Sequence, residues 1–289
     1  MSITAPERAL ASLTGLSVGD AFGDQFFLLA NRGLNPWDAT PPGPWAWSDD
    51  TEMACSVVDV LIRDDRVDQD ALAASFAARL DVGRRYGAGT LELLEKVRDG
   101  APWRVASAEG FGGNGSYGNG AAMRAAPLGA YFAGDLKRAA AEAAASAEVT
   151  HAHPEGVAGA VAVAVAAAHA AESGPGLFDA VLDHLAPGYV RRGVEQARKL
   201  EGVTVEQAAA RLGNGSRITA QDTVPFTLWV AVRHLDDYET AVRGCAAAGG
   251  DMDTTAAIVG GVLGARAGGV PADWRRRREP LPDWLGRPA

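Results

Sequence analysis

Two short acidic clusters contain the side chains best suited to chemistry. One reads WSDDT at 47–51 and the other GGDMDT at 249–254. Each joins two carboxylates to a hydroxyl immediately before a segment of helical periodicity. Their oxygen-bearing side chains are those of Ser48, Asp49, Asp50, Asp251, Asp253 and Thr254.

Helix capping is the simplest explanation of one such cluster, because Ser, Asp and Thr favour helix N termini. Capping needs only one oxygen, however, and four acids in one place would repel one another without cations. Hard oxygen ligands suit Mg²⁺ or Mn²⁺ rather than zinc. An EF-hand is excluded because Ala256 stands where that loop requires glycine. If the clusters meet in space, they can hold two cations about 3.5–4 Å apart, which orient vicinal hydroxyls and activate a water.

A glycine-rich segment at 110–124 is the second candidate. Its start matches GxGxxG, but no strand precedes it, so a dinucleotide-binding fold is not indicated. The rest is expected to run into a helix start, where backbone N–H groups and the helix dipole favour a phosphate. Phe111 and Tyr117 are placed to stack on a base. The alternative is a plain flexible loop. The candidate binding residues here are Phe111, Gly115, Ser116, Tyr117, Gly118, Asn119 and Gly120.

Two histidines, His151 and His153, precede another helical segment. A lone histidine is more often structural. A pair at a helix start is also suited to contact a phosphate or a ribose, and both interpretations stay open. The other histidines fit ordinary helix positions.

Helical periodicity dominates the rest of the chain, and alanine reinforces it. No regular alternation of strands and helices is present, so we predict one all-α domain with functional loops at helix starts. Residues 31–47 are expected to form an ordered loop. Helices are predicted over 51–63, 69–80, 90–98, 139–148, 156–171, 190–200, 205–212, 238–248 and 254–265.

Composition narrows the class of protein. The 289 residues carry a net charge of -9, which argues against general nucleic-acid binding. The arginine run 275–278 is interpreted as part of a solvated tail, 269–289. Cys55 and Cys245 are expected to be buried free thiols. The apolar stretch 157–168 is too short to span a membrane, and no signal peptide is evident, so the cytoplasm is expected.

Five motifs together resemble the ADP-ribosylglycohydrolases, the family that includes the dinitrogenase-reductase-activating glycohydrolases. They are GLSVGDAFG at 15–23, WSDDT at 47–51, GSYGNGAAMRAAP at 115–127, THAHPEGVAGA at 150–160 and GGDMDTTAAIVGGVLGA at 249–265. They occur in the family order and cover about residues 8–268.

The resemblance implies an all-helical fold with a binuclear magnesium site, whose occupants we take as two Mg²⁺ or Mn²⁺. It implies that the segment 115–120 holds a diphosphate, that Phe111 and Tyr117 flank an adenine, and that His151 lies near the diphosphate. The metals would hold the 2″ and 3″ hydroxyls of the distal ribose while water displaces the leaving group at C1″. The implied metal ligands are Ser48, Asp49, Asp50, Asp251, Asp253 and Thr254.

One departure from the family affects the chemistry. Many relatives have a glutamate where this chain has Phe27, and Asp24 is the nearest acid. This loss makes activity on serine-linked ADP-ribose doubtful, whereas arginine-directed relatives lack that glutamate too. The main hypothesis is therefore a hydrolase of ADP-ribose attached to an acceptor, in which Asp49 or Asp50 serves as the base.

Two other hypotheses stay open. In the first, the chain is a catalytically impaired relative that binds ADP-ribose or has a crystallin-like structural role. In the second, it is an enzyme that acts on a small-molecule or nucleic-acid adduct of ADP-ribose. An apolar pocket around Phe26 and Phe27 would favour a leaving group other than a charged side chain. The expected partner is an ADP-ribosylated protein or another ADP-ribose conjugate, and the expected state is a monomer.

Overall fold

The chain folds into helices joined by turns and loops, and the computed structural model describes residues 3–266 and 269–286. Within these residues there is no strand, only two isolated bridges, so the predicted all-α class is confirmed. Four short 3₁₀ helices are η1 (Gln25–Phe27), η2 (Leu29–Asn31), η3 (Val82–Arg84) and η4 (Asn119–Ala121). The α-helices are α1 (Ala5–Asp24), α2 (Asp49–Asp64), α3 (Gln69–Arg79), α4 (Ala88–Arg98), α5 (Trp103–Gly113), α6 (Ala126–Tyr131), α7 (Leu136–Glu148), α8 (Pro154–Glu172), α9 (Leu177–Leu182), α10 (Tyr189–Lys199), α11 (Val205–Leu212), α12 (Ala220–Arg233), α13 (Tyr238–Ala247), α14 (Met252–Gly264) and α15 (Ala272–Arg277).

All nine predicted helices are present, each within a few residues of its predicted bounds. The ordered loop before α2 is also confirmed, since Trp45 is fully buried and its indole N–H donates to the carbonyl of Pro41 at 3.0 Å. The predictions omitted α1, α5, α6, α9, α12 and α15. Of these, α1 and α12 are long helices that are buried on most sides. A helix covered on all sides lacks the polar face that reveals helical periodicity.

A row of glycines brings α1 and α14 into backbone contact. Gly15, Gly19 and Gly23 recur every four residues on one face of α1. A Cβ atom at Gly19 would lie 2.2 Å from the carbonyl oxygen of Ala256, and one at Gly23 would lie 2.3 Å from that of Met252. Any side chain would force the helices apart, so this glycine row fixes where the first turn of α14 lies on α1.

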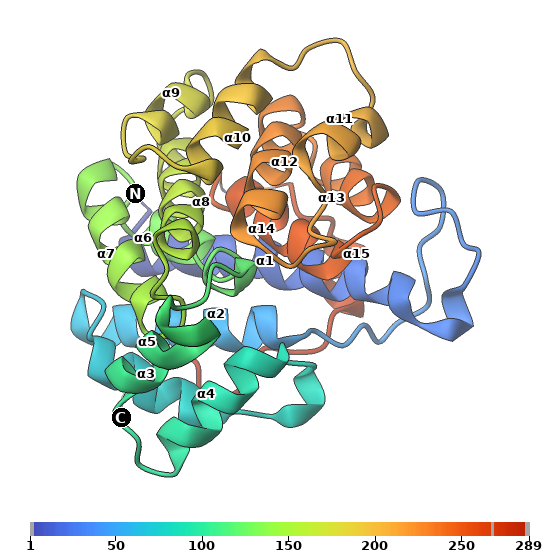
Figure 1. Ribbon diagram of the computed structural model, residues 1–289. Helices are drawn as coiled ribbons and strands as arrows, with labels where there is room; N and C mark the ends of the chain where they lie inside the picture. Colours follow the sequence, from blue (N-terminus) through green and yellow to red (C-terminus); the bar gives the residue numbers. More distant parts are fainter. Residues whose placement is uncertain (1–2, 267–268, 287–289) are drawn as a thin grey trace.

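Helix α1 also organises the rest of the molecule. Figure 1 shows it running through the middle, with α2 to α5 on one side and α8 to α14 on the other. One hydrophobic core connects the two groups. Helix α8 has the length and composition of a membrane span, but 67% of its apolar stretch is buried inside the protein. The helix reaches beyond the apolar stretch 157–168 at both ends, from Pro154 to Glu172. Its burial is that of a central core helix.

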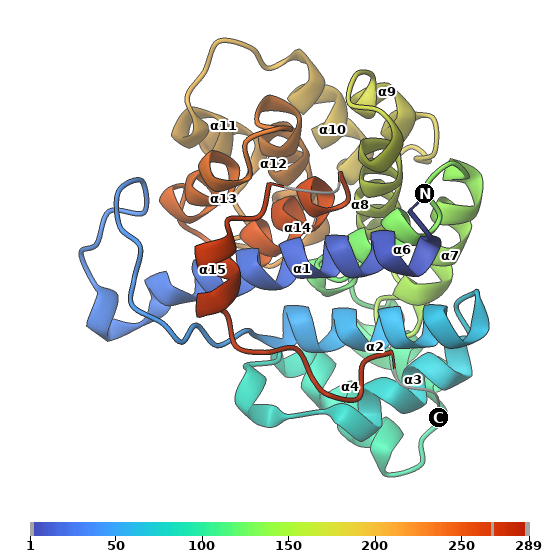
Figure 2. The same ribbon diagram turned by 180° about the vertical axis from the view of Figure 1, so that it is seen from behind.

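The C-terminal segment differs from the solvated tail that its charge suggested. Trp274 of α15 is buried and stacks on Phe22 with ring centroids 4.1 Å apart. Further on, Glu279 pairs with Arg84, and Arg79 lies 3.4 Å over the ring of Trp284. Figure 2 shows α15 lying across α1 and the following segment running below α2 in that view. The contacts of Trp274 and Trp284 hold this segment against the protein although it contains the arginine run 275–278. Residues 267–268 of the expected core and 287–289 of the expected tail lie outside the described residues.

Candidate active site

The N-terminal ends of α2 and α14 meet, and with them the two acidic clusters. The Thr254 hydroxyl donates to Asp50 Oδ1 at 3.4 Å, across 204 residues of sequence. Capping accounts for only part of the set: the Ser48 hydroxyl accepts from the Asp50 N–H at 3.2 Å, whereas Asp251, at the N-cap of α14, makes no side-chain cap bond. The carboxylates are therefore placed for something other than capping.

Asp20 of α1 holds the start of α2 in place, a role that no sequence pattern predicted. Its carboxylate accepts from the Ser48 N–H at 3.0 Å, the Thr51 N–H at 3.2 Å and the Thr51 hydroxyl at 2.5 Å. Asp20 is fully buried, which raises its pKa to about 6 even though these hydrogen bonds favour the charged form. Its position in the GLSVGDAFG motif was the one available signal.

The acidic cluster is electrostatically strained without a cation. Burial first, and the surrounding negative charges next, raise the pKa of Asp49, Asp50 and Asp253 well above the usual range. Asp50 Oδ2 is buried with no hydrogen-bond partner. A buried oxygen without a partner among other carboxylates and a hydroxyl is what a hard divalent cation would satisfy.

The donor set fits such a cation by its chemistry, although the side chains do not yet converge on one point. As they lie, no three Asp, Glu, His or Cys side chains among the described residues form a ready ligand group. Cation binding therefore requires the carboxylates to rotate towards one another. Asp251 is already oriented, because its Oδ2 accepts from the Asn119 side-chain amide at 2.7 Å.

A cation from the protein itself borders this cluster. Arg85 follows η3 with a left-handed backbone, φ 66°, and pairs with the nearly buried carboxylate of Asp24. The positive charge of Arg85 also lowers the pKa of Asp49, and the negative charge of Asp253 raises the pKa of Arg85. Sequence reasoning missed Arg85, because its partner lies 61 residues away and no local pattern connects them.

The glycine-rich segment forms the opposite end of the site. Its backbone pairs with the start of α12: the Asn119 N–H donates to Ile218 at 3.3 Å, and the Ala220 N–H donates to Tyr117 at 3.0 Å. The helix start expected after it is present: η4 forms a single 3₁₀ turn within the segment, and α6 begins at Ala126, two residues after its end. The nearest long helix start is that of α8, which approaches so closely that a Cβ at Gly156 would lie 2.6 Å from the Ser116 carbonyl oxygen.

Two aromatic rings stand at the mouth of this segment. Phe111 and Tyr117 are 59% and 38% exposed, with centroids 6.0 Å apart and ring planes at 46°. His153 meets Tyr117 edge-on at 5.3 Å, and its Nδ1 accepts from the Glu155 N–H as the N-cap of α8. His153 thus has the structural role left open by its sequence, whereas His151 is buried beside the glycines.

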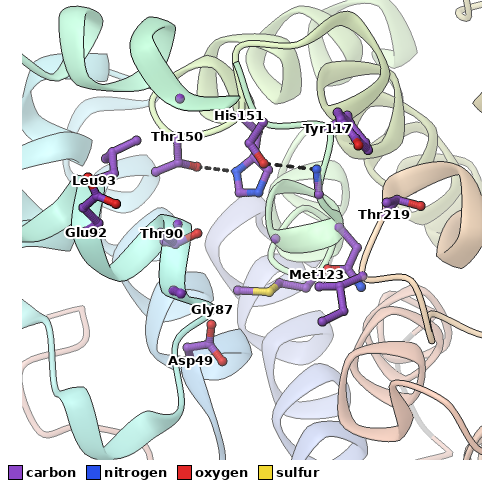
Figure 3. A pocket seen from close by; sticks show the side chains of 18 of the residues that line it. Asp49, Gly87, Thr90, Glu92, Leu93, Tyr117, Met123, Thr150, His151 and Thr219 are labelled. Atoms are coloured by element: carbon purple, nitrogen blue, oxygen red, sulfur yellow. Dashed lines mark hydrogen bonds between the residues drawn. The ribbon is translucent and has the colours of Figure 1, made fainter. Parts of the chain in front are cut away.

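A cavity of about 680 Å³ connects the acidic cluster to the aromatic pair. Its volume is within the range of small-molecule and cofactor sites. Figure 3 shows Asp49 at one end and His151 and Tyr117 at the other, with Met123 between them. The cavity is lined by every predicted site residue except Ser48 and Gly115, whose sequence neighbours Asp49 and Ser116 do line it.

Phe27 lies away from this cavity. It is 45% exposed and lines a second cavity of about 450 Å³, together with Phe26, Leu34 and Met252. An apolar pocket around Phe26 and Phe27 therefore exists, and none of the acids of the cluster lines it. Phe27, which stands where many relatives have a glutamate, does not line the main cavity.

Comparisons with known proteins agree with this architecture. The family model described as ADP-ribosylglycohydrolase matches residues 1–287. The human "ADP-ribosylhydrolase ARH3" is 30% identical over an alignment of 330 residues that covers 94% of this chain and 89% of the relative. The "ADP-ribosylarginine hydrolase Tri1" of Serratia proteamaculans is 27% identical over 286 residues, covering 93% and 74%. A solved structure titled "ADP-ribosylglycohydrolase-related protein complex" matches with a TM-score of 0.68 and 26% identity, covering 95% of this chain and 93% of its own. The chain belongs to the ADP-ribosylglycohydrolase family.

Proposed function

We propose that the protein is a hydrolase that cleaves the glycosidic bond at C1″ of ADP-ribose attached to an acceptor. The observation that carries the proposal is the buried, partnerless Asp50 Oδ2 within a carboxylate cluster, at one end of a cavity whose other end has two exposed aromatic rings. A ligand with a diol at one end, a base at the other and phosphates between matches that order of side chains. The names of the relatives ARH3 and Tri1 support the same substrate class.

Metal binding is part of the proposal. Ser48, Asp49, Asp50, Asp251, Asp253 and Thr254 would hold two Mg²⁺ or Mn²⁺. When bound, such cations position the 2″ and 3″ hydroxyls of the distal ribose and lower the pKa of a nearby water.

The chain's own residues supply the rest of the chemistry. Asp49 or Asp50 accepts a proton from the attacking water, because Phe27 cannot and lies outside the cavity. The water oxygen forms the new bond to C1″ as the bond to the acceptor breaks, and the acceptor leaves with its electron pair and gains a proton. The carboxylates also stabilise the positive charge that develops at C1″. Asn119 keeps Asp251 oriented through its 2.7 Å hydrogen bond.

A screen of acceptor linkages tests this function. Arginine-, serine- and nucleic-acid-linked ADP-ribose are offered with Mg²⁺, with Mn²⁺ or with excess EDTA, and released ADP-ribose is measured. We expect release from at least one substrate with metal and none in EDTA. Asp253→Ala should abolish release, because it removes a proposed ligand. Asp273→Ala, an exposed carboxylate on α15, is the matched control and should retain activity.

Two results would contradict the proposal. Full activity in EDTA would eliminate the two-cation mechanism. Tight ADP-ribose binding in calorimetry, without cleavage of any linkage, would favour a binding module. That alternative rests on Phe27 at the usual glutamate position and facing another cavity.

Adenine stacking is tested separately by Tyr117→Ala. We expect ADP-ribose affinity to fall by about 1–3 kcal/mol, the usual loss when a stacking ring is removed. Affinity for ribose 5-phosphate, which lacks the base, should not change. Tyr189→Ala removes a more exposed ring outside the cavity and is the control. Equal losses for both ligands would show that Tyr117 does not contact the base.

A further inference from the structure

A buried arginine stands behind the glycine-rich segment. Arg124 has no exposed surface and forms no ion pair among the described residues. Its guanidinium donates to the carbonyls of Gly120 at 3.1 Å and Ser146 at 3.0 Å, and to Thr150 Oγ1 at 2.9 Å. Burial lowers its pKa to about 9, so it stays charged at neutral pH and acts only as a donor. A buried cation is costly, and these contacts hold it in one orientation.

The direction of the Thr150 hydrogen bond follows from Arg124. Thr150 Oγ1 must accept from the guanidinium, because an arginine N–H cannot accept. The hydroxyl has one proton to donate, and the one acceptor in reach among the described residues is His151 Nδ1 at 2.7 Å. Figure 3 shows this bond between Thr150 and the imidazole. If Nδ1 of His151 were protonated, the Thr150 hydroxyl proton would have no partner among the described residues, so the arrangement that satisfies both groups has Nδ1 as an unprotonated acceptor.

The single N–H proton of the neutral imidazole is consequently on Nε2. His151 is buried, and burial, followed by the Arg124 charge, lowers its pKa to about 3, so the ring is neutral. Its Nε2 edge faces the glycines: a Cβ at Gly118 would lie 3.2 Å from Nε2, and one at Gly120 would lie 3.0 Å from it. No acceptor for this N–H is present among the described residues, although His151 lines the cavity.

We infer that Arg124 and Thr150 are positioning residues that hold His151 in its Nε2–H tautomer, as a neutral donor to an anionic oxygen of the ligand. In the other tautomer a lone pair at Nε2 would face that oxygen and repel it. The class of ligand, a phosphate ester bound along the glycine-rich segment, rests on the proposed function; the tautomer itself does not. His151 then recognises the anion by a hydrogen bond rather than by charge, with its second nitrogen fixing the tautomer.

A pair of substitutions at Thr150 separates this role from packing. Thr150→Val keeps the shape of the side chain but removes the hydroxyl, whereas Thr150→Ser keeps the hydroxyl but loses a methyl group. We expect ADP-ribose affinity in calorimetry to fall about tenfold in the valine variant, the size of one hydrogen bond to a charged group, and to stay near wild type in the serine variant. The opposite order would show that Thr150 serves packing alone and would overturn the inference.

Two further measurements complete the test. Thr227→Val removes a buried hydroxyl of α12 that donates to Val224, so it reports what a buried Thr→Val change costs in stability elsewhere. Imidazole ¹⁵N chemical shifts of the ligand-free protein, assigned with His151→Asn, report the tautomer directly. A protonated Nε2 beside an unprotonated Nδ1 is expected, and a protonated Nδ1 would overturn the inference. Because the shifts need neither ligand nor turnover, they answer the question even if the protein cleaves no ADP-ribose conjugate.

Discussion

Replacing Asp50 with asparagine is expected to abolish hydrolysis and to stabilise the metal-free protein. Asparagine has the same shape but removes one of several buried, mutually repelling carboxylates, and Asp50 Oδ2 has no hydrogen bond to lose. Loss of an outer partner of a metal ligand already costs about 10–100-fold in activity, so loss of Asp50, a proposed ligand, should cost more than about 100-fold. In EDTA, the melting temperature should rise by about 2–4 °C for each 1 kcal/mol of repulsion removed.

The pH dependence of the metal-free protein provides the check. Asp20, Asp49, Asp50 and Asp253 have raised pKa values, so the folded state binds protons more tightly than the unfolded state. Their contribution to stability is complete below the unfolded pKa of 3.8, and for Asp20 it is lost as the pH rises through about 6. Metal-free wild type should therefore be more stable at pH 5 than at pH 7.5, and Asp50→Asn should reduce that difference. Asp273→Asn is the control, because a hydrogen bond from Arg277 lowers the pKa of the Asp273 carboxyl instead of raising it. An unchanged melting temperature of Asp50→Asn in EDTA would show that the carboxylates do not repel one another.

Among the substitutions considered, Asp20→Ala should lower the free energy of unfolding the most. Three buried donors, the N–H groups of Ser48 and Thr51 and the Thr51 hydroxyl, would lose their acceptor. Each unsatisfied buried donor costs about 1–3 kcal/mol, so the free energy of unfolding should fall by about 3 kcal/mol or more. Denaturant unfolding with Mg²⁺ measures the loss. Activity should fall with it, because the start of α2 would no longer be held on α1.

Two variants make the Asp20 result specific. Asp20→Asn keeps one acceptor oxygen and should lose less stability than the alanine variant. Asp237→Ala removes a single cap acceptor from α13, which typically costs about 1 kcal/mol, and should leave activity intact. If Asp20→Ala were no more destabilising than Asp237→Ala, Asp20 would be only another capping residue.

Local patterns made part of the site predictable. Asp49, Asp50, Asp251 and Asp253 are closely spaced carboxylates at helix starts, so composition and periodicity were enough to single them out. The glycine-rich segment was recognisable in the same way. Helices with one polar face, such as α10 and α11, were found for a related reason: their burial is one-sided and leaves a period in the sequence.

Residues whose role depends on distant partners escaped prediction. Asp20 is one carboxylate in a nearly all-buried helix, and its three donors lie 28 and 31 residues away. Arg85 matters because of Asp24, and Arg124 because of Thr150; neither pairing leaves a local signal. The burial of Trp274 was not predicted, because the four arginines that follow it suggested a solvated tail. In each case the deciding interaction is a tertiary contact, which periodicity does not encode.

The glycine row between α1 and α14 has a consequence for biosynthesis. The ribosome makes α1 first and α14 more than two hundred residues later, and the acidic cluster needs both of them in backbone contact. Such long-range contacts form late, after most of the intervening chain has emerged. The nascent protein therefore cannot assemble its acidic cluster until synthesis has passed α14.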